Sequence, residues 1–271
     1  MTNHLPAWAP DAVDIETPSA ARMYDYYLDG SHNFAADRVL AEEYIKVLPE
    51  IRNISRANRL YLRRAVRTLA AAGVDQFLDL GSGMPTVGNV HEVAGAVNPD
   101  AKVVYVDADP VTVAHGKAIL ATEPNAAYLH ADLSNPDQVL ASAEVAQHLD
   151  LSRPVGVLMV AVLHFVPDAD DPAEVIARYR DASAAGSYLV VSHATDDYNP
   201  RTMEQATGVY SRASHSMNFR SRAEVQDLFA GYELLAPGLV DVIHWRPEPG
   251  DPDPYDGDVT RYNLLAAVGR R

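Results

Sequence analysis

Cysteine is absent from this sequence, which also lacks long apolar runs and an excess of positive charge. Without cysteine, the chain can form no disulfide, thiolate nucleophile or cysteine-ligated zinc site. No apolar run reaches the roughly 18 residues that a membrane-spanning helix needs. Residues 1–19 also lack the basic start and apolar middle of a secretory signal. We therefore expect a cytoplasmic protein with no membrane partner.

The net charge is −15 over 271 residues, which opposes non-specific binding to nucleic acid. A local basic groove stays possible with this charge. Hydrophobic residues make up 48% and charged residues 22%, as in ordinary globular proteins. The length suits one large α/β domain or two small ones. We expect a small-molecule substrate and no nucleic-acid partner, and the sequence leaves the oligomeric state open.

The segment from Val74 to Thr86 organises the rest of the chain. Its apolar run is interrupted by Asp79 and followed by Gly81 and Gly83, a pattern that predicts a strand, a tight turn and a helix. Glycine permits the left-handed backbone of such a turn and lets a ligand approach the main chain. An acid at the end of a buried strand is costly unless it is paired. Asp79 therefore indicates a ligand or a ring of backbone donors.

From this segment onward, strands alternate with helices. The predicted strands are Gln76–Leu80, Lys102–Asp107, Ala126–His130, Val155–Val162 and Ser187–His193. The predicted helices are Val87–Val97, Pro110–Thr122, Pro136–Leu149 and Pro172–Ala184. This alternation predicts a parallel sheet with helices on both faces. Ligands of such sheets bind beyond the carboxyl ends of the strands.

The last part of the chain breaks the alternation. Helices are predicted over Arg201–Ser214 and Ser221–Phe229, followed by two β-like runs, Tyr232–Trp245 and Tyr262–Val268. A proline-rich acidic loop joins these two runs without a crossover helix, so we expect them to be antiparallel. The predicted fold class is α/β, with a Rossmann-like, seven-stranded, mostly parallel sheet that ends in an antiparallel hairpin.

The N-terminal part is expected to form a loose arm over residues 1–18 and three helices, Ser19–Gly30, Ala35–Val47 and Ile51–Ala72. We divide the chain into an arm and helical cap, residues 1–73, and a core, residues 74–271. The polar, aromatic-rich segment 19–38 is either a cap over a ligand or an ordinary helical hairpin. The third helix carries a row of arginines on one face: Arg52, Arg56, Arg59, Arg63 and Arg67. Because the total charge is acidic, we interpret this face as a solvated surface.

Polar residues stand at the carboxyl end of each predicted parallel strand: Asp79, Asp107, Asp132, His164 and His193. Asp107 follows Gly81 by 26 residues, where an acid can accept two hydrogen bonds from a ribose diol. Each acid taken singly is also a common helix N-cap. Three acids in order after a glycine turn favour a nucleoside-shaped ligand.

The chain resembles the actinobacterial S-adenosyl methyltransferase family, once catalogued as a domain of unknown function, within the class I S-adenosylmethionine-dependent methyltransferases. The segments that carry this resemblance are RMYDYYLDGSHNFAADR, FLDLGSGMPT, NVHEV, VVYVDADPV, VLMVAVLHFVPD, GSYLVVSH and FRSRAEV. The resemblance covers nearly the whole chain and implies S-adenosylmethionine as cofactor, with an unidentified acceptor. One departure is Pro85, which stands at the third glycine of the usual pattern. Since proline lacks a backbone donor, we expect the following helix to start late, with Thr86 as its cap.

The resemblance also implies roles for individual residues. Asp79 would meet the cofactor ammonium, Gly81 and Gly83 its methionine part, Asp107 and Ala108 the ribose, Asp132 and Leu133 the adenine, and Ala161 and His164 the sulfonium. From residue chemistry, we expect Arg22 to pair with the cofactor carboxylate, and Tyr24 and Asn33 to add hydrogen bonds. His164 or His193 could serve as a general base, although either could be a structural histidine. No metal ligand set is expected.

Two other functions stay open at this point. A nicotinamide-dependent oxidoreductase shares the glycine turn and the ribose acid, but Asp79 and the terminal hairpin argue against it. A non-catalytic sensor or scaffold could bind S-adenosylmethionine and present the N-terminal cap to a partner. The lack of an evident catalytic base keeps this second alternative open.

Overall fold

Five apolar runs form the parallel half of one sheet in the computed structural model, which describes residues 14–85 and 88–271. These strands are β1 (Gln76–Leu80), β2 (Lys102–Asp107), β3 (Ala126–His130), β4 (Gly156–Val160) and β5 (Tyr188–Ala194). The antiparallel half contains β6 (Glu233–Leu234), β7 (Val240–Asp241) and β8 (Leu264–Arg270). The strand order is β3-β2-β1-β4-β5-β8-β6, with β7 also paired to β8. Since β1 lies between β2 and β4, the strand order reverses there, and a ligand crevice is expected at the carboxyl ends of these strands.

The Rossmann-like α/β class and the antiparallel end of the sheet are confirmed, but the expected count of seven strands is not. Within the described residues the sheet has eight strands, because the run Tyr232–Trp245 forms two short strands instead of one. Pro237 and Gly238 separate them: proline offers no N–H to a ladder, and Gly238 has a φ of 89°.

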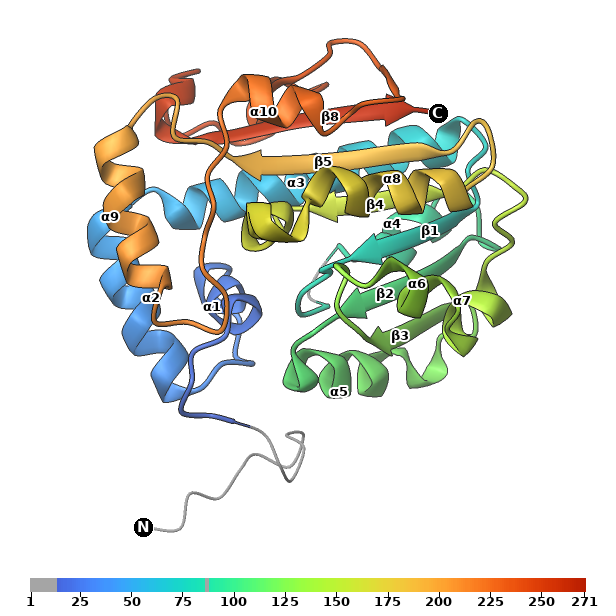
Figure 1. Ribbon diagram of the computed structural model, residues 1–271, viewed down its shortest axis with the longest axis horizontal. Coiled ribbons are helices and arrows are strands. Elements are labelled where there is room, and N and C mark those ends of the chain that lie inside the picture. Colours follow the sequence, from blue (N-terminus) through green and yellow to red (C-terminus); the bar gives the residue numbers. More distant parts are fainter. Residues whose placement is uncertain (1–13, 86–87) are drawn as a thin grey trace.

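Helices cover both faces of the sheet (Figure 1). They are α3 (Ile51–Ala71), α4 (Val90–Gly95), α5 (Pro110–Ile119), α6 (Pro136–Leu140), α7 (Ala143–His148), α8 (Pro172–Ala182) and α10 (Arg222–Asp227). Two apolar clusters separate the faces: α3, α4 and α5 contribute to one, and α6, α7 and α8 to the other. Neighbouring strand residues such as Phe77 and Leu78 point into opposite clusters. The chain therefore has a three-layered core.

Several helix ends differ from the predictions. The predicted helix Pro136–Leu149 is two helices, because the Ser142 hydroxyl caps α7 by accepting from the Val145 N–H. The helix after the glycine turn begins late, at Val90, and Asn89 is its N-cap within a capping box. The predicted cap Thr86 lies outside the described residues.

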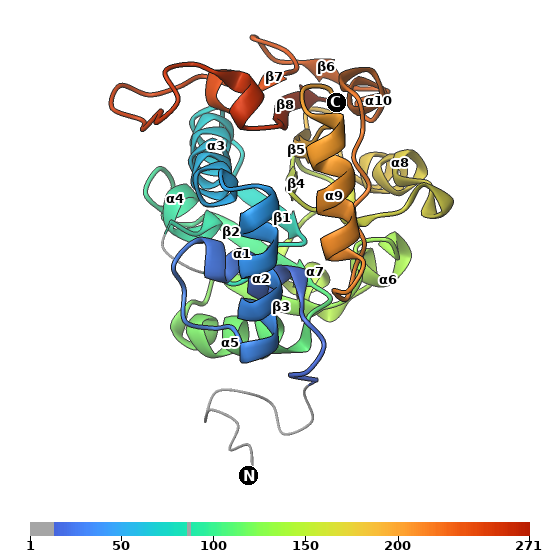
Figure 2. The same ribbon diagram turned by 90° about the vertical axis from the view of Figure 1, so that its left-hand side faces the viewer.

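The remaining helices are α1 (Ala20–Tyr27), α2 (Ala35–Val47) and α9 (Pro200–Tyr210). Figure 2 shows the three together, with α9 from the second half of the chain beside the N-terminal pair. The cluster that contains sheet residue Val190 also contains Met23 of α1 and Tyr44 of α2. The helices α1, α2 and α9 therefore close one side of the molecule near the strand ends. Within the described ranges, no helix is long and apolar enough to cross a membrane.

Candidate functional site

The turn after β1 is built on Gly81 and Gly83, whose φ angles are 67° and 64°. A Cβ at Gly81 would lie 2.1 Å from the Val162 side chain, so this position also needs glycine for space. The N–H groups of Gly81 and Ser82 donate to the Val106 carbonyl at 2.8 and 3.1 Å. The Tyr128 hydroxyl donates to the Gly83 carbonyl at 2.7 Å. The turn is thereby fixed to β2 and, beyond it, to β3.

Asp107 lies directly beside this turn. Its carboxylate accepts from the Gly83 N–H at 2.8 Å and from the Asp109 N–H at 2.9 Å. Burial raises the pKa of Asp107 to about 6 against the pull of these backbone donors. Each carboxylate oxygen keeps a second lone pair for a further donor. The acid predicted to bind a ribose and the glycine turn therefore belong to one structure.

Asp79 is buried below the same turn. Burial raises its pKa to about 7, the Arg59 guanidinium acts in the opposite direction, and the Asp107 charge adds to the increase. Arg59 was expected on a solvated face of α3, but its side chain lines the same cavity as Asp79. The expectation is correct for other members of the row: Arg52 and Arg56 both pair with exposed Asp29.

A cavity of about 800 Å³ joins these groups to the rest of the site. Its lining includes most of the predicted site residues: Arg22, Tyr24, Asp79, Gly81, Gly83, Asp107, Ala108, Asp132, Leu133, Ala161 and His164. Asn33 does not line it, because its side chain donates instead to Asp25 and to the Gly30 carbonyl. The predicted cofactor-binding residues other than Asn33 therefore line one continuous cavity.

The third strand reaches the cavity with Asp132 and Leu133. Leu133 is buried, whereas Asp132 is exposed and accepts from the Ser134 N–H at 2.8 Å. This pair offers an apolar wall beside a carboxylate. It has the chemistry that the edge of a flat heteroaromatic ring would need.

Ala161 directly follows the fourth strand, β4, and adopts a left-handed φ of 55°. Its N–H donates to Ser192 on β5, 2.9 Å from the hydroxyl oxygen and 3.1 Å from the carbonyl oxygen. The backbone then enters a single 3₁₀ turn, η2 (Leu163–Phe165), that contains buried His164. Burial lowers the pKa of His164 well below its usual value, and the nearby His193 and Arg220 add to this effect. His164 is therefore a neutral imidazole at pH 7.

His193 is a structural histidine. Its Nδ1 donates to the Ala194 carbonyl at 2.7 Å, and its Nε2 accepts from Arg220 at 2.9 Å. Burial lowers its pKa to about 4. Arg220 also donates to the carbonyls of Leu163 and Val166, so it holds the η2 turn in place. The sequence predicts no role for Arg220, although this residue lies in the segment FRSRAEV.

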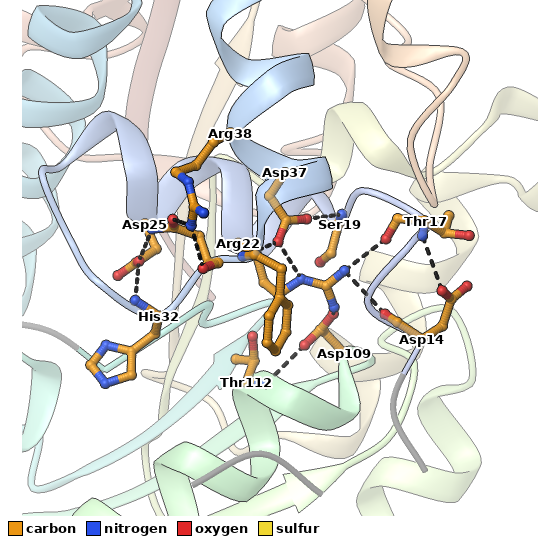
Figure 3. A network of polar contacts seen from close by, with 12 residues as sticks. Asp14, Thr17, Ser19, Arg22, Asp25, His32, Asp37, Arg38, Asp109 and Thr112 are labelled. Carbon is orange, nitrogen blue, oxygen red and sulfur yellow. Dashed lines mark hydrogen bonds and ion pairs between the residues drawn. The ribbon is translucent and has the colours of Figure 1, made fainter. Parts of the chain in front are cut away.

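Arg22 makes different contacts from those expected (Figure 3). Its guanidinium donates to Asp37 at 2.9 Å, to Asp109 at 2.8 Å and to the Thr17 carbonyl at 2.7 Å. Because Asp109 is the N-cap of α5 and its N–H binds Asp107, Arg22 connects the cap helices to the predicted ribose acid. Four of its five N–H donors bind within the protein and join these elements, and its pairing with the cofactor carboxylate stays a prediction.

Tyr24 belongs to a partly buried chain of hydrogen bonds that the sequence did not predict. Its hydroxyl donates to the Ser55 carbonyl and accepts from the Asn58 amide at 2.9 Å. The Asn58 carbonyl oxygen accepts from the Ser192 hydroxyl at 2.6 Å, and Ser192 accepts from Ala161. The chain links α1 to the tip of β4 through α3.

A match to a family model decides to which family the chain belongs. The S-adenosyl methyltransferase family model matches residues 6–271. The chain belongs to the S-adenosyl methyltransferase family. It is an S-adenosylmethionine-dependent methyltransferase whose acceptor is unidentified.

Two solved structures resemble this methyltransferase over nearly its whole length. A candidate methyltransferase from Thermobifida fusca is 40% identical, with a TM-score of 0.90, over 98% of this chain and 99% of that one. A DUF574 family protein from Streptomyces avermitilis is 35% identical, with a TM-score of 0.92, over 96% of this chain and 100% of that one. These likenesses agree with the family assignment.

A curated relative matches a smaller part of the methyltransferase. The formate–tetrahydrofolate ligase of Cutibacterium acnes is 27% identical over 135 residues, which are 49% of this chain and 23% of the ligase. The chain therefore spans less than a quarter of the length of that relative.

The residues of the methyltransferase fit the cofactor. At Gly83 no described atom lies within 4 Å of the place where a Cβ would stand, so the turn leaves open space there, and both Asp79 and Asp107 are buried carboxyls that gain from a cationic or hydroxylic partner. The volume of about 800 Å³ exceeds what one nucleoside needs and lies within the usual range for ligand pockets. Space therefore remains for a second small molecule.

Proposed function

We propose that this methyltransferase binds its cofactor across the tips of β1, β2 and β3 and methylates a small molecule held between His164 and the cap. In this proposal Asp107 holds the ribose hydroxyls, Asp79 meets the ammonium group, and Leu133 with Asp132 borders the adenine. The observation that carries the assignment is the hydrogen bond between the Gly83 N–H and the Asp107 carboxylate. This hydrogen bond holds Asp107, the proposed ribose acid, beside the turn that is proposed to approach the methionine part of the cofactor.

When bound, the cofactor supplies a cationic methyl group for direct displacement by a nucleophile, with the sulfur as leaving group. The residues of the chain align the acceptor and exclude water. Ala161, held in its left-handed conformation by Ser192, shapes the wall near the methyl group. His164 is the candidate to receive a proton from the acceptor, since its imidazole is neutral at pH 7. Because a low pKa makes it a weak base, it suits acceptors that already carry a good nucleophile.

Two further parts of the proposal concern partners and location. The net charge of −15 supports a small molecule over nucleic acid as the acceptor. A cytoplasmic location also stays a prediction.

The experiment is a calorimetric titration of S-adenosylhomocysteine into the wild type and into Asp107→Ala. We expect the variant to bind at least about tenfold more weakly, because a hydrogen bond to a buried charged group contributes roughly 1.5–3 kcal/mol. Asp100→Ala, on the exposed loop before β2, is the matched control and should bind like the wild type. Equal affinities of the wild type and Asp107→Ala would refute the ribose role.

A further inference from the structure

The cavity has two chemically different ends. The end at β1, β2 and β3 is lined by acids and glycine, as described above. The other end is lined by side chains of α1, α2, α9 and the loop after α9: Tyr27, Tyr44, Met203, Tyr210 and Met217. All five are buried. Apart from the paired Arg22, the lining residues from α1, α2 and α9 carry no charge in the part of the chain described here.

Aromatic rings run from His164 to this second end in direct contact. The His164 and Phe165 ring centroids lie 4.5 Å apart, and those of Phe165 and Tyr210 lie 5.7 Å apart. Tyr44 meets Tyr210 edge-on at 4.8 Å and contacts Tyr27 at 6.0 Å. The position where the methyl group is proposed to lie therefore opens onto an aromatic wall.

The tyrosines are neutral at physiological pH. Burial raises the pKa of Tyr27 and Tyr44 well above the usual value, and that of Tyr210 to about 12. The hydroxyls are also weakly engaged: those of Tyr27 and Tyr210 lie 3.5 Å apart, and that of Tyr44 lies 3.6 Å from the Met217 sulfur. They can therefore turn toward a polar group on a flat ligand.

The charges around the cavity oppose an anionic acceptor. Its described lining contains six aspartates, Asp14, Asp79, Asp107, Asp109, Asp132 and Asp170, against two arginines, Arg22 and Arg59. Arg22 is held by Asp37 and Asp109, and the field of Arg59 acts on Asp79. The positive charges thus face acids at the cofactor end, and a carboxylate or phosphate among the tyrosines would be buried without a cation.

We propose that the tyrosine-lined end, formed by Tyr27, Tyr44, Met203, Tyr210 and Met217, binds an uncharged, flat aromatic acceptor. The acceptor's polar group meets the tyrosine hydroxyls or His164, and its ring packs against Phe165 and the two methionines. Methionine suits this use because its flexible thioether adapts to different ring shapes. This inference rests on the proposed function in one respect: the cofactor occupies the other end of the cavity.

The test measures binding of three fluorescent probes that share one ring system, with and without saturating S-adenosylhomocysteine: 2-naphthol, 2-naphthoate and 2-naphthylmethylammonium. We expect 2-naphthol to bind at least about tenfold more tightly than either ion, because burying an unpaired charge is costly. Failure of 2-naphthol to bind, or equal binding of either ion, would overturn the proposal.

Variants that block the tyrosine-lined end test whether 2-naphthol binds there. Met203→Trp should fill the tyrosine-lined end and abolish naphthol binding, whereas Met203→Leu, the matched control, should keep it. Met217→Trp is a second blocking variant on a different segment. Unchanged naphthol binding in both tryptophan variants would also overturn the proposal.

Titration of S-adenosylhomocysteine into each variant separates this inference from the proposed function. Retained cofactor affinity with lost naphthol binding is the expected result and shows that each variant is folded. If S-adenosylhomocysteine does not bind even to the wild type while naphthol does, the cofactor assignment fails and the aromatic site stands.

Discussion

Asp79 and Asp107 are two buried acids whose ionised forms the fold disfavours. Burial raises their pKa to about 7 and about 6, respectively. A carboxylate that served only to stabilise the ligand-free protein would not suit either environment, because the protein loses stability when the buried group ionises. A ligand that offers an ammonium group to one and hydroxyls to the other would recover this loss. The electrostatics thus favour a binding role for both residues.

The raised pKa of Asp79 predicts how stability depends on pH. The folded state holds a proton at Asp79 up to about pH 7, while the unfolded chain releases it near the ordinary aspartate pKa of 3.8, so stability falls as the pH rises from about 4 to about 7. Asp79→Asn removes this loss. Relative to the wild type, it should therefore gain up to roughly 3 kcal/mol more at pH 8 than at pH 5, at roughly 1.4 kcal/mol per pKa unit.

Urea denaturation of the ligand-free proteins at the two pH values measures this difference. Asp100→Asn, an exposed acid, is the control and should show no such change with pH. An equal stability difference between the wild type and Asp79→Asn at pH 5 and pH 8 would contradict the buried, proton-holding Asp79.

At the scale of elements, Arg22 joins α1, α2 and the start of α5 (Figure 3). Asp37 is fully buried and also accepts from the backbone N–H groups of Ser19 and Phe34. Arg22→Met would leave this carboxylate without its cation, which should destabilise the protein by about 3–5 kcal/mol. Arg38→Met, on exposed Arg38 in the same network, should cost less than about 1 kcal/mol.

The double variant Arg22→Met/Asp37→Asn distinguishes an unpaired charge from lost packing. Because the asparagine carries no charge, the double variant should recover part of the stability lost in Arg22→Met. Chemical denaturation of the three variants measures this. A double variant less stable than Arg22→Met would show that packing, and not the buried charge, dominates.

The elements that were predictable from sequence are those with strong local signals. The strands β1, β2 and β3 have their predicted ends, because acids, glycines and prolines follow the apolar runs closely. The strands β6 and β7 were merged, since their break depends on two residues inside a continuous β-like run. The roles of Asn58 and Ser192 could not be predicted, because their hydrogen bond joins residues 134 positions apart. Arg59 was misplaced because the spacing of a helical row does not show which member faces a cavity.

At the scale of the whole molecule, the proposed boundary at residue 73 runs through a shared core. Met23 and Tyr27 of α1 lie in the same apolar cluster as Val190 of the sheet. Tyr61 of α3 donates from its hydroxyl to the carbonyls of Val191 on β5 and Ala267 on β8. The cap helices therefore share their stabilising contacts with the sheet, which favours one cooperative unit over two independent domains.

This shared core predicts a single unfolding transition. Far-UV circular dichroism follows all helices, whereas the fluorescence of Trp245 follows the packing of this core residue on α3, where its ring lies 5.4 Å from that of Tyr61. In a Trp8→Phe background, the urea transitions from the two signals should coincide. S-adenosylhomocysteine at a hundred times its Kd should shift both together by about 2.7 kcal/mol, because it binds only the folded state. Two separate transitions, with the ligand shifting only one, would show instead that the cap folds as a domain of its own and that the cofactor does not depend on it.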